Sequence, residues 1–142
     1  MSSCAAQAIS LASPDSQAKV RRALEASWSE KTSYCYNPNL APASYGQCAG
    51  TAIVIYERYG GEILRSEIIR SDGKKLRHFY NRIDGQRLDF TADQLEMSEH
   101  WSMAEYLDIP SSDAEAETEL MPGQLDELRR AFLRAIQSED GV

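Results

Sequence analysis

The chain has 142 residues, of which 42% are hydrophobic and 26% are charged, a composition typical of a soluble globular domain. This length suits one domain that buries its core without disulfide bonds. We expect a flexible segment over residues 1–14, followed by a single domain over residues 15–142. Lysine and arginine number 15, against 22 aspartates and glutamates, so the formal charge is −7. This balance disfavours nucleic-acid binding, which needs clustered basic side chains.

The three cysteines, Cys4, Cys35 and Cys48, are too few and too irregularly spaced for the disulfide framework of a secreted protein. No segment approaches the roughly 20 apolar residues that cross a bilayer, and the N-terminus lacks the basic region of a signal peptide. We therefore expect a cytoplasmic protein that binds neither membrane nor nucleic acid. The sequence contains no glycine-rich phosphate loop, and no cofactor is expected.

The first predicted element is an amphipathic helix that begins near Ser13 and continues to about Ser27. Residues 29–47 contain several prolines, asparagines and serines and predict an irregular loop of about 18 residues, a length that is often functional. Residues 48–59 are apolar around nearly the whole circumference of a helix, which indicates a buried helix. The glycines at 60–61 supply its C-terminal end.

An antiparallel meander is predicted next. Apolar and β-branched residues predict strands over 62–70, 76–83 and 86–90. Between the last two strands, Asp84-Gly85 is a strong signal for a two-residue type I′ turn, which needs positive φ at both positions.

The last third of the chain is less regular. Residues 91–94 fit a capping box that opens a short helix. Residues 111–119 are acidic and predict an exposed loop or the frayed start of a helix. Apolar residues recur at helical spacing over 124–137 and predict an amphipathic C-terminal helix. We therefore predict an α+β fold, in which a central buried helix packs on a small antiparallel sheet, flanked by N- and C-terminal helices.

The expected turn fixes the register of the last two strands. With residues 84–85 as the loop, Tyr80 lies opposite Asp89 and His78 lies opposite Thr91, and these side chains share one face. His78 and Asp89 are then diagonal neighbours, about 7–8 Å apart at the backbone, a distance that a hydrogen bond between their side chains can bridge. A register slip of one residue would place them on opposite faces.

Cys48 is the first residue of the predicted buried helix. A helix N-terminus favours a thiolate through its unpaired N–H groups and the positive end of its dipole. An imidazole can take the proton of a thiol, and a carboxylate can hold the imidazole in the right tautomer. We therefore predict Cys48, His78 and Asp89 as catalytic residues, with Gln47 as an oxyanion donor. This arrangement requires the helix to pack on the sheet face that carries His78.

Each candidate also has a purely structural alternative. Cys48 could be inert core, and His78 could be a polar strand residue that faces solvent. Asp89 could cap a turn or pair with a nearby arginine, and Gln47 could pack within the loop. A zinc site that includes Cys35 is disfavoured because the sequence has no closely spaced ligand pair, so no metal is expected.

Five short motifs occur in one order over roughly residues 24–95. They are Ala26-Ser27-Trp28-Ser29, Tyr45-Gly46-Gln47-Cys48-Ala49, Gly60-Gly61-Glu62-Ile63-Leu64, His78-Phe79-Tyr80-Asn81-Arg82 and Leu88-Asp89-Phe90-Thr91. Together they resemble the YunG-like family of uncharacterised bacterial proteins, a resemblance that implies no established activity. A more distant resemblance, of arrangement alone, is to papain-like and transglutaminase-like thiol enzymes. Those enzymes have a cysteine at a helix start, then a histidine on one strand and an Asp, Asn or His on the next.

From these residues we predict a cysteine-dependent hydrolase or acyl transferase, of the amidase, peptidase or deamidase type, that acts on an unknown amide or peptide substrate through a Cys-His-Asp triad. The alternative is a small non-catalytic binding or interaction protein that retains the same scaffold. Under that alternative, the sulfur of Cys48 would be buried far from His78, beside a large exposed apolar patch.

Overall fold

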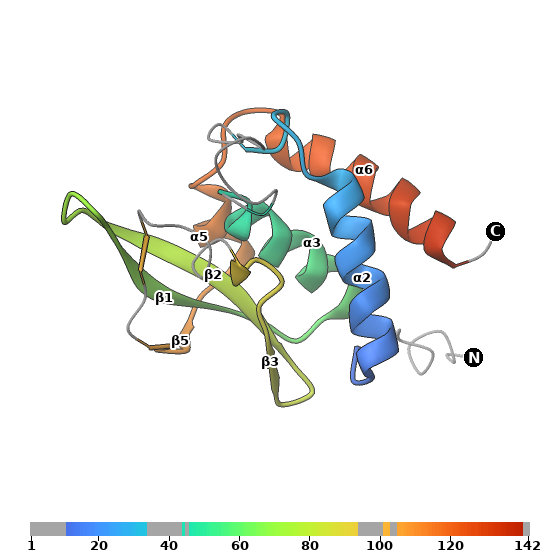
Figure 1. Ribbon diagram of the computed structural model, residues 1–142, viewed down its shortest axis with the longest axis horizontal. Helices are drawn as coiled ribbons and strands as arrows, with labels where there is room; N and C mark the ends of the chain where they lie inside the picture. The colour runs from blue at the N-terminus through green and yellow to red at the C-terminus, as the bar shows by residue number, and fades with distance from the viewer. Residues whose placement is uncertain (1–10, 34–43, 45, 94–100, 103–104, 141–142) are drawn as a thin grey trace.

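Figure 1 shows the computed structural model of the chain, which describes residues 11–33, 44, 46–93, 101–102 and 105–140. In these residues the helices are α2 (Pro14–Ser27), α3 (Cys48–Tyr59), α5 (Asp113–Glu117) and α6 (Gln124–Glu139), and the strands are β1 (Glu62–Arg70), β2 (Lys75–Ile83), β3 (Gln86–Leu88), β4 (Trp101–Ser102) and β5 (Ile109–Pro110). The predicted α+β class is confirmed, and α5 shows that the acidic segment contains a short helix.

The strands form one antiparallel sheet in the order β3-β2-β1-β4, and β5 also pairs with β1. Asp84 and Gly85 have φ values of 52° and 79°, so the predicted hairpin turn is present. Arg82 pairs with Arg87, as the predicted register requires. The hairpin register is therefore confirmed as far as β3 extends.

Helix α3 lies between the sheet and the pair of helices α2 and α6 (Figure 1). Eight of its twelve residues are buried, which confirms the prediction from its apolar circumference. It packs on the sheet face that carries Phe79 and Ile83, and Asn81 Nδ2 donates to the Ala52 carbonyl at 3.0 Å. The expectation that α3 would pack on the His78 face is therefore wrong. The apolar side chains of β2 point to the other face, and burying them decides which face the helix covers.

The two terminal helices pack against each other and enclose the core from the side opposite the sheet. Ser13 caps α2 by accepting the N–H of Ser16 at 3.1 Å. Leu11, which precedes the domain start expected at residue 15, is buried in this core. Trp28 ends α2, and its indole N–H donates to Thr51 of α3 at 3.0 Å. This bond satisfies the polar end of a side chain that is otherwise packed in the core.

Several predictions concern residues outside the described ones. The flexible segment predicted over residues 1–14 lies outside them up to residue 10, and the loop predicted over 29–47 lies outside them at residues 34–43 and 45. The short helix predicted to follow the capping box at 91–94 falls on residues 94–100, which are also outside the described part. Within the part of the chain that the structure does describe, no helix is long and apolar enough to cross a membrane.

Gly61 joins α3 to β1 and is expected to be intolerant of any side chain. It has φ +78°, and a Cβ there would lie 2.4 Å from the Arg82 carbonyl oxygen of the neighbouring strand. We expect Gly61→Ala to lower the free energy of unfolding by at least about 2 kcal/mol, because backbone strain and a backbone clash combine. Gly85→Ala, in the hairpin turn, is the matched control: its φ is +79° with no atom within 4 Å, so only strain of about 1 kcal/mol applies. Equal losses in urea denaturation would contradict the role of the clash.

Candidate active site

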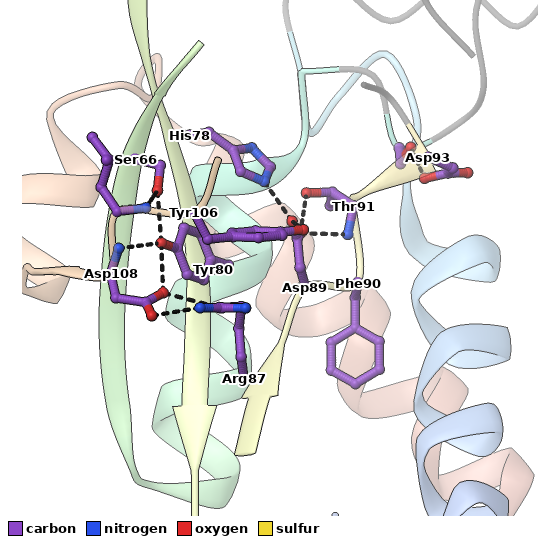
Figure 2. Close-up of polar contacts among 12 residues, drawn as sticks. Ser66, His78, Tyr80, Arg87, Asp89, Phe90, Thr91, Asp93, Tyr106 and Asp108 are labelled. Carbon is purple, nitrogen blue, oxygen red and sulfur yellow. Dashed lines mark hydrogen bonds and ion pairs between the residues drawn. The ribbon is translucent and has the colours of Figure 1, made fainter. Parts of the chain in front are cut away.

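His78 and Asp89 form a buried pair beside the end of β3 (Figure 2). His78 Nε2 lies 2.6 Å from Asp89 Oδ2, and the two side chains are 0% and 5% exposed. The predicted opposition of Tyr80 to Asp89, and of His78 to Thr91, does not form, because β3 ends at Leu88. The N–H and hydroxyl of Thr91 both donate to Asp89 Oδ1, at 3.2 and 3.3 Å, and turn the chain away from β2. Asp89 therefore caps a turn and binds His78 at the same time.

The charges of this site favour an imidazolium facing a carboxylate. Burial lowers the pKa of His78, but the hydrogen bonds and charges of Asp89 and Cys48 outweigh it and raise the pKa to about 10. Burial raises the pKa of Asp89, but its bonds to His78, Tyr106 and Thr91 leave that pKa below its ordinary value. Both shifts stabilise the ion pair at neutral pH.

Cys48 is the first residue of α3 and is half-buried. Its side chain interacts with His78, since a hydrogen bond that the protonated ring donates to Cys48 is among the causes of the raised histidine pKa. α3 covers the opposite sheet face, so this contact is made at the sheet edge. In the described residues β3 pairs only with positions 81–83 of β2, so β3 itself does not extend alongside His78.

Gln47, the predicted oxyanion donor, is the N-cap residue of α3, and its side chain makes no capping hydrogen bond. The residue is 1% exposed, and its Nε2 donates to the Ser29 carbonyl at 3.4 Å, a long and weak bond. Its Oε1 is buried with no hydrogen-bond partner among the described residues. The side chain of Gln47 therefore does not cap the N–H groups that begin the helix at Cys48.

Sequence reasoning did not identify Tyr106 as a residue of the site. The Tyr106 hydroxyl donates to Asp89 Oδ2 at 2.7 Å, the same oxygen that His78 binds. Burial and the Asp89 carboxylate raise the pKa of Tyr106, so its hydroxyl keeps its proton. Residues 98–119 show no periodicity that could have revealed this contact, which depends on tertiary structure.

A second polar cluster ties together the segments on either side of the site. Asp93 accepts from Arg21 of α2 at 2.8 Å and from the Ser44 hydroxyl at 2.5 Å. Arg21 also donates to the Phe90 carbonyl at 3.0 Å. Ser44 lies four positions before Cys48, and Phe90 follows Asp89, so this cluster fixes the approach of the two chain segments to each other.

A metal centre has no set of ligands in the described part of the chain. There, no group of three or more His, Cys, Asp or Glu side chains is arranged to hold a metal ion. Cys35, considered above as a possible zinc ligand, lies outside the described residues.

Comparison with known proteins relates this chain to one family. The family model described as YunG protein matches residues 16–137. A protein of Bacillus subtilis (strain 168), described as uncharacterized protein YunG, is 36% identical over 119 residues, which span 84% of this chain and 93% of that protein. No solved structure matches significantly. The resemblance to papain-like and transglutaminase-like enzymes therefore rests on residue order alone.

Proposed function

The chain belongs to the YunG family, and we propose that this member is a cysteine-dependent hydrolase or acyl transferase acting on an amide or peptide carbonyl. One observation carries the proposal. The buried His78 bonds Asp89 at 2.6 Å and also interacts with Cys48, the first residue of α3. A thiol, an imidazole and a carboxylate in this order are the groups that thiol acyl transfer requires.

Cys48 is the nucleophile in this proposal, and His78 is its acid–base partner. Asp89 binds Nε2 of His78, and in this proposal the sulfur of Cys48 interacts with the other ring nitrogen, Nδ1. The proton already lies on His78 at neutral pH, because the raised pKa keeps the ring an imidazolium. The sulfur therefore attacks as a thiolate: Sγ forms a bond to the substrate carbonyl carbon while the π electrons move to the oxygen. The N–H groups that begin α3 stabilise the oxyanion, and Gln47 could join them only by giving up its long bond to Ser29.

The covalent intermediate then breaks down in two steps. The carbon–nitrogen bond breaks, His78 donates its proton to the leaving amine, and a thioester remains on Cys48. A water molecule, or an acceptor amine in the case of transfer, attacks the thioester and gives its proton to His78. The sulfur leaves as a thiolate, which restores the pair of thiolate and imidazolium. Asp89 stays ionised throughout and holds the ring in one orientation.

The same order of groups occurs in papain-like and transglutaminase-like enzymes, where the nucleophile also begins a helix. We propose that this likeness reflects a shared chemical solution. The helix start supplies both the field that favours a thiolate and the donors for the oxyanion.

Acylation of Cys48 by p-nitrophenyl acetate tests the proposal. In a Cys4→Ser, Cys35→Ser background, where Cys48 is the one remaining thiol, we expect the folded protein to gain one acetyl group at Cys48 at pH 7, seen by mass spectrometry. The rate should exceed that of the same protein unfolded in urea by at least tenfold, because only the fold supplies His78 as a base.

Cys48→Ala in that background should gain no acetyl group while its circular dichroism spectrum stays unchanged. Equal acetylation with and without the Cys48→Ala substitution, or equal rates for folded and unfolded protein, would overturn the enzyme proposal. In either case the non-catalytic binding protein becomes the better account of this scaffold.

A further inference from the structure

Residues 106–110, here called the strap, cross the sheet face opposite α3 (Figure 2). The strap ends in β5, where Ile109 pairs with Arg65 of β1. Its first residue, Tyr106, reaches the Asp89 carboxylate. The strap therefore connects an outer strand of the sheet to the buried His78–Asp89 pair.

Two fully buried side chains of the sheet hold the strap in place. The N–H of Leu107 donates to Ser66 Oγ at 2.6 Å, and the N–H of Asp108 donates to the Tyr80 hydroxyl at 2.8 Å. The Tyr80 hydroxyl in turn donates to Asp108 Oδ1 at 2.9 Å. Asp108 has φ 52°, a conformation that these bonds stabilise against its steric cost.

Arg87 of β3 binds two residues of the strap, Asp108 and Tyr106. Its guanidinium donates to both carboxylate oxygens of Asp108, at 2.9 and 2.5 Å, a bidentate pair. The same guanidinium lies 4.4 Å from the centroid of the Tyr106 ring, and the Tyr106 and Tyr80 rings form a T-shaped pair with 4.9 Å between their centroids. The Tyr106 ring is thus held on two sides, and its hydroxyl has one orientation toward Asp89.

We propose that Tyr106 is a positioning residue, which locks the Asp89 carboxylate so that Asp89 can lock the His78 ring. Oδ2 receives both Tyr106 and His78, while Oδ1 receives Thr91, so rotation of the carboxylate would break several bonds at once. The effect on Cys48 rests on the proposed function, whereas the effect on His78 does not.

The test measures exchange of the His78 Nε2 proton with water, by NMR at pH 7, in a His100→Gln background that leaves one histidine. In Tyr106→Phe, which keeps the ring and loses the hydroxyl, we expect this exchange to become at least tenfold faster. Backbone amides of β2 should keep their wild-type exchange rates. Acetylation of Cys48, measured in the corresponding Cys4→Ser, Cys35→Ser protein, should become about tenfold slower.

Tyr56→Phe is the matched control, because it removes the hydroxyl of an exposed tyrosine on α3 and should change neither rate. Unchanged ring exchange in Tyr106→Phe would overturn the proposal. So would equal acceleration of the ring proton and the β2 amides, since that would make the strap a general stabiliser of the fold. If ring exchange accelerates as expected but wild-type Cys48 is never acetylated, the positioning role stands and the proposed function fails.

Discussion

The Asp89→Asn variant is expected to lose about 3 kcal/mol of its free energy of unfolding at pH 7. The Asp89 side chain is 5% exposed and faces a histidine that is fully buried. Asparagine keeps the shape of the side chain but removes the charge, so the imidazolium must either stay unpaired in the interior or lose its proton. Urea denaturation followed by circular dichroism measures the loss.

Asp84→Asn makes the same chemical change five positions away, at the exposed tip of the same hairpin. Asp84 has φ 52°, a conformation that asparagine also adopts readily. We expect its unfolding midpoint to equal that of the wild type. An Asp89→Asn protein as stable as this control would contradict the assignment of a buried ion pair.

The pH dependence of this loss follows from the two shifted groups. The pKa of His78 is raised from an ordinary value of 6.5 to about 10, so its contribution is complete below pH 6.5 and is lost as the pH rises through 10. The pKa of Asp89 is lowered, so its contribution is present above the ordinary value of 3.8 and is lost as the pH falls through the lowered one. The stability difference between wild type and Asp89→Asn should therefore be largest between pH 3.8 and pH 6.5. It should shrink as the pH falls below this range and as it rises toward 10. A difference that is constant from acid to alkaline pH would contradict this pairing.

The local elements of the fold could be predicted because local signals specify them. The apolar circumference over 48–59 and the glycines after it give α3 its observed bounds, and Asp84-Gly85 sets the register that Arg82 and Arg87 adopt. The strand after the turn was predicted too long. Its end at Leu88 depends on a side-chain bond between Asp89 and Thr91, which competes with the strand ladder.

Only the part of the site that depends on local sequence signals could be predicted. The proximity of His78 and Asp89 follows from a two-residue turn, which is local information. The prediction of the sheet face that α3 covers was wrong. The sequence does contain a signal for the correct face, because the apolar residues Phe79 and Ile83 lie on the side of β2 opposite to His78. The Tyr106 contact had no local signal, because the strap is placed by bonds to Ser66 and Tyr80 from strands far away in the sequence.

A double-variant cycle on the rate of Cys48 acetylation is expected to be strongly non-additive. His78→Gln removes the base and should slow acetylation by about 10²-fold or more. Asp89→Asn should slow it by a comparable factor, because Asp89 acts only by orienting and charging His78. The double variant should therefore be no slower than His78→Gln alone, once rates are corrected for the folded fraction at pH 7. If the two losses instead multiply, Asp89 influences the sulfur by a route that bypasses the imidazole, and the order of action from carboxylate to ring to thiol is wrong.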